Sequence, residues 1–226
     1  CILRNQFGED VVNHYTYCLH SDGDIQEPVS QGAIALAGHW GLGKLINYYD
    51  ANNAQISGKV TRSDSTDYVK LYEAYNWHVQ EIDGHDRGAI RDAIRQAQME
   101  IEKPSVIIGR TTMAQGCATM EDDHNTHGSP LPPEEIAATK EKLELNSEEF
   151  FHLPEDVLTD FRSGYEFARS EVSAWNSALE VRMEEPEFSQ KWHLAFGDGL
   201  PSFDIAQYEP GQKVATRKVW GPFIKG

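Results

Sequence analysis

Residues 15–24, YTYCLHSDGD, carry the pattern that decides the fold: a short apolar run that ends in an Asp-Gly pair. The run Tyr15–His20 predicts a β-strand. Similar short runs follow at Leu45–Asp50, His78–Ile82 and Ser105–Arg110, and helical stretches separate them. Strands that alternate with helices form parallel βαβ units with helices on both faces of the sheet. We therefore expect an α/β fold of three layers, with a mainly parallel sheet between helices.

The stretches between these strands have the periodicity of helices. Val29–Trp40 is small and apolar, which predicts a well-buried helix, and Asp67–Tyr75 predicts a second one. Asp86 is a suitable N-cap for a third helix, which Pro104 is expected to end. Its apolar residues recur at helical spacing, at Ile90, Ile94, Ala97 and Ile101.

The pattern changes after residue 111. Thr111–Ser129 predicts a long polar loop, and loops of this length in a compact domain are often functional. Pro132 and Pro133 predict the start of a helix over Glu134–Leu145. A longer helix is expected over about Glu155–Glu184, with a stripe that we interpret as core packing. The stripe consists of Val157, Phe161, Tyr165, Ala168, Val172, Trp175 and Leu179. Periodicity fades from Pro186 onward, and residues 195–226 resemble an interdomain linker.

Composition limits the classes of partner. The chain has 226 residues, of which 39% are hydrophobic, and a net charge of −16. Such a charge repels nucleic acid and anionic membranes, so we expect neither as a partner. The three cysteines, Cys1, Cys18 and Cys117, have no paired spacing, which favours a reducing cytoplasm. The chain starts without Met, as a segment cut from a longer protein would.

Polar residues at the carboxyl ends of the first two strands suggest a metal site. Asp22 and Gly23 follow the first strand, and Asn52 follows the second. Ligands of parallel sheets collect at this edge. A carboxylate and an amide oxygen suit Mg²⁺ or Ca²⁺, and Gly lets a phosphate approach the backbone. An ordinary Asp-Gly turn is the alternative interpretation.

Gly38–Leu45, GHWGLGKL, nearly matches a nucleotide phosphate-binding loop. Leu45 stands where that loop needs Ser or Thr, and the segment precedes a strand instead of following one. We therefore interpret the segment as the capped end of a helix that turns into the strand Leu45–Asp50.

His127 is the best catalytic or phosphate-contacting candidate, because it lies in the loop after the fourth strand. An imidazole can donate to a phosphate oxygen and can transfer protons. A solvated loop histidine is the alternative. His85 is expected to serve as a turn and helix-cap residue. A zinc site near His124 and His127 is disfavoured, since neither Cys nor helical ligand spacing is present.

Taken together, these segments resemble transketolases. Ala35–Ile46, ALAGHWGLGKLI, is the most specific of them. The others are His14–Tyr17, Ser21–Gly23, Tyr49–Asn52, Trp77–Val79, Asp83–His85, Lys103–Pro104, Thr111–Thr112 and Thr126–Ser129. The resemblance is good from about residue 11 to 160. It implies the thiamine diphosphate-binding fold, with residues 1–185 as an N-terminally incomplete diphosphate-binding domain. Residues 186–226 would be a linker and the start of the pyrimidine-binding domain.

The resemblance also implies a role for each matching residue. Asp22 and Asn52 would ligate Mg²⁺ (or Ca²⁺) through their side chains, and Ala54 through its backbone carbonyl. Gly23 would donate its N–H to the diphosphate. The remaining roles concern the ring and the reaction: Ile56 would pack near the thiazolium, His127 would contact the diphosphate near the reacting centre, and Glu27 would link cofactor sites across a dimer.

The chain departs from the family pattern in three places. Ser21 replaces the first Gly of Gly-Asp-Gly, Gly32 replaces a second acid, and Ala114–Gly116 replaces Gly-Phe-Gly. None of these removes a metal ligand. The family's N-terminal His-Pro-Gly segment and its activating Glu are expected outside this chain, so we expect the isolated chain to be inactive.

The implied activity is reversible transfer of a two-carbon ketol group from a ketose phosphate to an aldose phosphate. The implied enzyme is a cytoplasmic homodimer of the pentose phosphate pathway that contains thiamine diphosphate and acts on sugar phosphates. A relative such as dihydroxyacetone synthase is one alternative, because acceptor preference depends on parts outside this chain. A non-catalytic remnant or interaction module that keeps the fold is the other.

Overall fold

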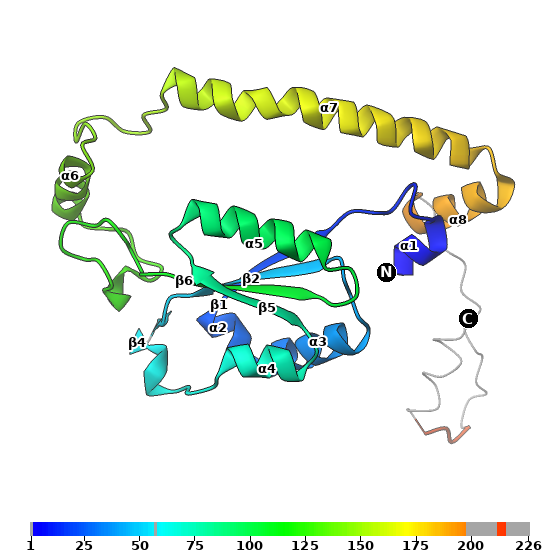
Figure 1. Ribbon diagram of the computed structural model, residues 1–226, viewed down its shortest axis with the longest axis horizontal. Helices are drawn as coiled ribbons and strands as arrows, with labels where there is room; N and C mark the ends of the chain where they lie inside the picture. Colours follow the sequence, from blue (N-terminus) through cyan, green and yellow to red (C-terminus); the bar gives the residue numbers. More distant parts are fainter. Residues whose placement is uncertain (1, 57, 198–211, 216–226) are drawn as a thin grey trace. The chain divides into compact units, whose positions relative to one another are not determined.

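A computed structural model describes residues 2–56, 58–197 and 212–215 (Figure 1). The chain divides into two compact units, one of residues 13–160 and the other of residues 2–12 and the segment after residue 160. The elements are, in chain order, α1 (Ile2–Phe7), β1 (Thr16–Ser21), α2 (Asp22–Gln26), α3 (Pro28–His39), β2 (Leu45–Ala51), β3 (Ala54–Gln55), β4 (Gly58–Lys59), the 3₁₀ turn η1 (Val60–Arg62), α4 (Tyr68–Ala74), β5 (His78–Asp83), α5 (Arg87–Met99), β6 (Ser105–Arg110), the 3₁₀ turn η2 (His124–Thr126), α6 (Pro133–Lys142), α7 (Glu155–Met183) and α8 (Pro186–Phe196).

The first unit contains a parallel sheet with the strand order β1-β2-β6-β5. All four predicted strands are confirmed, with ends within one residue of the expected positions. A short antiparallel hairpin, β3-β4, follows β2. The register pairs Ser21 with Asp50, and Asp50 with Gly109, so the carboxyl ends of β1, β2 and β6 meet at one edge of the sheet.

Helices cover both faces of this sheet, which confirms the three-layer α/β fold (Figure 1). Side chains alternate between the faces along each strand, so Val106 and Ile108 of β6 point one way and Ile107 the other. Ile108 packs in a core with α2, α3 and α4, whose buried members include Ile25, Ile34 and Tyr72. Ile107 packs with Ile46 of β2 and with Ala93 and Ala97 of α5. A strand buried on both faces is apolar along its length, which explains why the sequence predicted it so well.

The glycine-rich turn between α3 and β2 needs glycine where other parts of the backbone pass close to it. A Cβ on Gly38 would lie 1.8 Å from the Tyr75 carbonyl oxygen, and one on Gly43 would lie 1.9 Å from that of Ile101. Gly41 has a φ of +57°, a conformation that favours glycine. The segment precedes β2, so its interpretation as a helix end is confirmed.

Two helix predictions need correction. Only Ile34, Ala37 and Gly38 of α3 are buried, whereas Val29 is 77% exposed. The helix was expected to be well buried, but only one of its faces meets the sheet. α5 ends at Met99, before Pro104 and without Ile101, because the Glu100 carboxylate accepts the backbone N–H groups of the next turn.

The long helix α7 is confirmed, but only the C-terminal end of its apolar stripe packs as expected: Leu179 lies partly buried against the core of Phe7, Val11 and Phe188. None of its described residues is buried. Phe161 is 77% exposed and Val172 is 58% exposed. Helical periodicity identified the element, yet it carries no information about what lies against the apolar face.

The second unit has its own aromatic core, which the sequence did not predict. Phe7 of α1 is fully buried and packs against Phe188 and Trp192 of α8, where periodicity was expected to fade. Trp175 of α7 donates its indole N–H to the Val11 carbonyl at 2.9 Å. Most of the expected linker at 195–226 lies outside the described residues.

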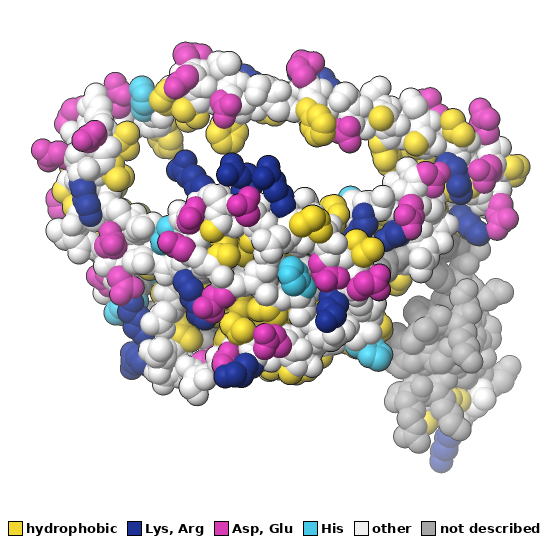
Figure 2. All heavy atoms as spheres, viewed as in Figure 1, with side chains coloured by type: hydrophobic (Ala, Val, Ile, Leu, Met, Phe, Trp, Pro, Cys, Tyr) yellow, Lys and Arg dark blue, Asp and Glu magenta, His cyan; other side chains and the backbone are white. Residues whose placement is uncertain are grey.

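Acidic side chains are spread over the face shown in Figure 2. Basic side chains gather over α5, where Arg87, Arg91 and Arg95 lie on one surface (Figure 2). Among the described residues, no helix combines the length and the apolar character needed to cross a membrane.

Candidate functional site

Asp22 is the first residue of α2 and lies directly after β1, as predicted. Its side chain is only 4% exposed. Both of its carboxylate oxygens accept a hydrogen bond from the chain: Tyr49 Oη donates to Oδ1 at 2.6 Å, and the Asn53 N–H donates to Oδ2 at 2.7 Å. The carboxylate is therefore held in one orientation.

The turn after β2 carries the second predicted ligand. Asn52 is 8% exposed, and its Oδ1 accepts the Ala54 N–H at 2.9 Å. Its Nδ2 donates to Asp50 at 3.0 Å, which leaves Oδ1 as the oxygen available to a cation. The Asn53 N–H donates to Asp22, so this hydrogen bond joins the segment after β1 to the turn after β2. The joined segments contain Asp22, Asn52 and Ala54.

The electrostatic surroundings leave the Asp22 charge without a cationic partner. Among the described residues, no Lys, Arg or His forms an ion pair with Asp22. Burial, together with the hydrogen bond to Asp22, raises the pKa of Tyr49 well above its usual range, so Tyr49 stays a donor. A buried carboxylate without a counter-ion is costly unless a cation is bound there.

The other predicted residues of this region are more open. Gly23 is exposed, and a Cβ built on it would meet no described atom within 4 Å. The protein's own packing therefore does not require glycine here, and the space beside its backbone is free for a ligand. Glu27 is exposed where α2 meets α3, and Ile56 is 82% exposed after β3.

His127 lies at the end of the 3₁₀ turn η2, in the loop that follows β6. Its backbone N–H donates to the His124 carbonyl at 3.0 Å. Its Nδ1 atom is buried, and no described residue provides a hydrogen-bond partner for it. Lys59 of β4 binds both the backbone oxygen and the carboxylate of Asp122, so this loop is tied to the hairpin that starts at Ala54. No hydrogen bond within the described part of the chain joins His127 to Asp22.

His85 has a role that the sequence did not reveal. Its Nε2 accepts the Thr112 backbone N–H at 2.8 Å, so it clamps the loop after β6. His85 lines a hollow of about 360 Å³ together with Asp50, Asn52 and Thr111. The signal available in the sequence was its position after β5, at the sheet edge where ligands collect.

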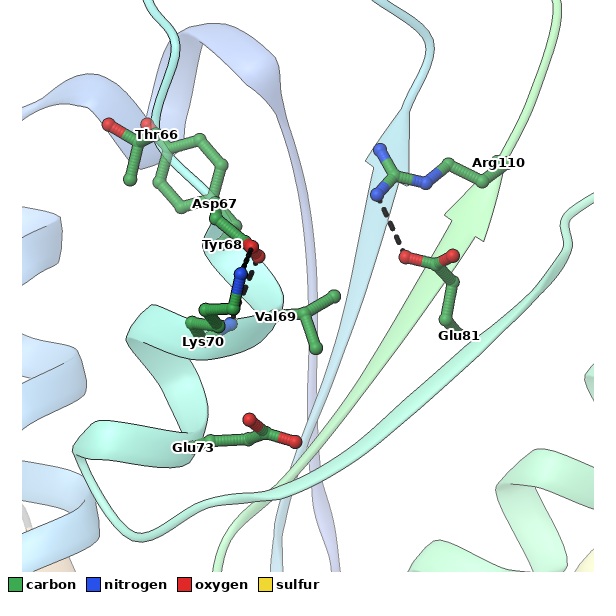
Figure 3. A pocket seen from close by; sticks show the side chains of 8 residues that line it. All are labelled: Thr66, Asp67, Tyr68, Val69, Lys70, Glu73, Glu81 and Arg110. Atoms are coloured by element: carbon green, nitrogen blue, oxygen red, sulfur yellow. Dashed lines mark hydrogen bonds and ion pairs between the residues drawn. The ribbon is translucent and has the colours of Figure 1, made fainter.

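A larger hollow of about 560 Å³ lies between α4 and the ends of β5 and β6 (Figure 3). Both of its basic side chains are paired: Lys70 lies 2.6 Å from Asp67, and Arg110 lies 2.8 Å from Glu81. It contains none of the predicted site residues. Because both of these basic side chains are already paired, the hollow is less suited to an anionic ligand than the edge at Asp22.

The residues at this edge fit a divalent cation with a diphosphate. Asp22 offers a carboxylate without a counter-ion, Asn52 an amide oxygen, and Ala54 a backbone carbonyl. Hard oxygen ligands of this kind, completed by phosphate oxygens, suit Mg²⁺ or Ca²⁺. The buried Nδ1 of His127 can bind a further anionic oxygen. Within the described residues, no three His, Cys, Asp or Glu side chains gather around one metal position.

Comparison with known proteins identifies the family. The sequence model described as "Transketolase, thiamine diphosphate binding domain" matches residues 3–201. The chain belongs to the transketolase family. It is 35% identical over 221 residues to a transketolase of Sinorhizobium medicae, a match that covers 96% of this chain and 32% of the relative. It is 34% identical over 225 residues to transketolase 2 of Escherichia coli, a match that covers 95% of this chain and 33% of that relative.

Solved transketolases have the same fold. The transketolase of Campylobacter jejuni matches with a TM-score of 0.84 at 33% identity, over 98% of this chain and 34% of that protein. A transketolase of Pichia stipitis in complex with sedoheptulose-7-phosphate matches with a TM-score of 0.81 at 31% identity. This match covers 93% of this chain and 33% of that protein. The chain thus spans about a third of the length of the transketolases it matches.

Proposed function

We propose that this chain supplies the metal- and diphosphate-binding half of the thiamine diphosphate site of a transketolase. The observation that carries the proposal is the buried Asp22 carboxylate, which has no cationic partner among the described residues and is joined to the Asn52 turn. The reaction served is the reversible transfer of a two-carbon ketol group between sugar phosphates. When bound, the cofactor supplies a thiazolium carbon that can act as a carbanion, and the protein positions it.

Each residue has a defined task in this proposal. Asp22, Asn52 and the Ala54 carbonyl hold Mg²⁺ or Ca²⁺, which neutralises the diphosphate. Gly23 donates its backbone N–H to a phosphate oxygen. The open space beside Gly23 and the unpartnered Nδ1 of His127 support two contacts to the cofactor's anionic end.

The remaining assignments rest on the family resemblance. Exposed Ile56 packs near the thiazolium ring, and exposed Glu27 links cofactor sites across a homodimer. We also propose that residues 1–185 belong to the diphosphate-binding domain, and that residues 186–226 are a linker and the start of a pyrimidine-binding domain. The enzyme is cytoplasmic, and its substrates are a ketose phosphate and an aldose phosphate.

Calorimetric titration of thiamine diphosphate into the full chain, with and without Mg²⁺, tests the proposal. We expect binding that requires Mg²⁺ and that Asp22→Asn or Asn52→Ala weakens at least about tenfold. Asp92→Asn is the matched control, because Asp92 is an exposed acid of α5 on the other side of the sheet. Absence of Mg²⁺-dependent binding by the folded wild-type chain, even with a partner that carries the missing domain, would favour a non-catalytic remnant.

A further inference from the structure

Tyr49 is the only described side chain that donates to Asp22 Oδ1. It lies in β2, is 2% exposed, and reaches Asp22 across the strand boundary at 2.6 Å. The Asn53 N–H holds the other oxygen at 2.7 Å. Together these two donors fix the plane of the carboxylate, and each oxygen keeps a lone pair for a further ligand.

The Tyr49 ring is itself held on two sides. His20 stacks on it, with ring centroids 5.2 Å apart and planes 16° apart. Tyr68 meets it edge-on at 5.7 Å and 85°. The ring also belongs to the buried core beneath α2, α3 and α4. A donor fixed in this way cannot follow the carboxylate if the carboxylate rotates.

We propose that Tyr49 is a positioning residue, which orients the Asp22 carboxylate for a divalent cation before the cation binds. The inference rests on the proposed function of the site, and it adds a residue to which nothing in the sequence pattern assigned a role. Partners that orient a metal ligand from behind typically change metal affinity by about 10- to 100-fold when they are removed. The Tyr49 hydroxyl is in the position of such a partner.

The chain offers a close control for this inference. Tyr72 is another buried tyrosine of the same core, at 0% exposure. Its hydroxyl lies 3.2 Å from His20 Nε2, and within the described part of the chain it forms no hydrogen bond with Asp22. Tyr72→Phe therefore removes a buried hydroxyl of the same kind without touching the carboxylate.

The experiment compares Tyr49→Phe and Tyr72→Phe with the wild-type full chain. Calorimetry measures the Kd of Mg²⁺ in the presence of saturating thiamine diphosphate. We expect Tyr49→Phe to raise this Kd at least about tenfold, and Tyr72→Phe to leave it within about twofold. In the absence of metal, hydrogen exchange of the Asn53 amide should accelerate in Tyr49→Phe only. The reason is that Asp22, the acceptor of this amide, is then no longer held by the Tyr49 hydroxyl.

Equal Mg²⁺ affinities and equal Asn53 exchange in the two variants would overturn the inference while the proposed function stands. A wild-type chain that binds no Mg²⁺ with the cofactor would overturn both. If Tyr49→Phe fails to fold, the crystal structure of the wild-type chain with Mg²⁺ and thiamine diphosphate decides. We expect the Tyr49–Asp22 hydrogen bond to persist there, and its loss on metal binding would overturn the inference.

Discussion

Gly38 and Gly32 lie on the same helix, α3, and differ in what surrounds them. A Cβ on Gly38 would meet the Tyr75 carbonyl oxygen at 1.8 Å, whereas one on Gly32 would meet no described atom within 4 Å. We expect Gly38→Ala to lower the free energy of unfolding by about 1–3 kcal/mol, as overpacking does. Gly32→Ala should raise it by up to about 1 kcal/mol, because alanine is the better helix former. Urea denaturation of both variants measures the difference, and equal effects would contradict the assigned packing.

At the scale of residues, the sequence predicted the site in part. Asp22, Asn52 and His127 were predicted because they follow strands, and a parallel sheet brings strand ends to one edge. The structure joins the Asp22 and Asn52 turns, whereas the part of His127 in the site stays a prediction. Tyr49 was not found, because a tyrosine within a strand has the same pattern as a core residue. Its contact with Asp22 depends on how β1 and β2 are paired, which no local pattern specifies.

At the scale of elements, α5 depends on its N-cap. The Asp86 carboxylate accepts the backbone N–H groups of Gly88 at 2.7 Å and Ala89 at 3.1 Å. We expect Asp86→Ala to reduce stability by about 1 kcal/mol, the usual value of such a cap. Asp92→Ala, which removes exposed ion pairs of the same helix, should change stability by less. Thermal unfolding monitored by circular dichroism measures both, and an equal loss would argue against the cap.

The loop after β6 is fastened to α6 by a charged acceptor. Glu135 accepts hydrogen bonds from the backbone N–H groups of Thr119 and Met120 and from the Thr119 hydroxyl. The hydrogen bond from the Thr119 backbone N–H has the largest effect on the pKa of Glu135, and the bond from the Thr119 hydroxyl has the next largest. Both hold this pKa below its usual range. The folded pKa lies below the unfolded value of about 4.3, so this stabilisation is complete above that pH. It is lost as the pH falls through the folded pKa.

We therefore expect protection of the Thr119 and Met120 amides from hydrogen exchange to fall in acid. In Glu135→Gln the protection should be lower at neutral pH and should no longer depend on this titration. Glu134→Gln, which changes the exposed neighbour, should behave like the wild type. An unchanged pH profile in Glu135→Gln would show that other groups fasten the loop.

Elements were predicted well where burial imposed a pattern and poorly where it did not. The inner strands β2 and β6 are apolar because helices cover both faces, and the ends of all four strands were found within one residue. The helix α8 was missed, since its buried Phe188 packs against Phe7, at the other end of the chain. The apolar stripe of α7 predicted the helix correctly, but only its end at Leu179 packs against a core, because periodicity does not identify a partner.

At the scale of the whole molecule, the two units have separate cores. Phe7 and Phe188 belong to the second unit, and Ile107 and Ile108 to the sheet. We expect Phe7→Ala to cost about 3–5 kcal/mol, the usual loss for a buried phenylalanine. Hydrogen exchange should locate this loss in α1 and α8, while β6 keeps its protection. Equal loss of protection in β6 would mean that the units unfold together.

In the proposed site, the edge of the sheet at Asp22 holds a divalent cation with a diphosphate. Mn²⁺ broadens the NMR signals of nearby amides, so a titration of the wild-type chain with Mn²⁺ and thiamine diphosphate locates the ion. We predict selective broadening of the Gly23, Asn53 and Ala54 amides, which Asp22→Asn abolishes. Broadening spread over the acidic surface and unchanged by Asp22→Asn would contradict the account.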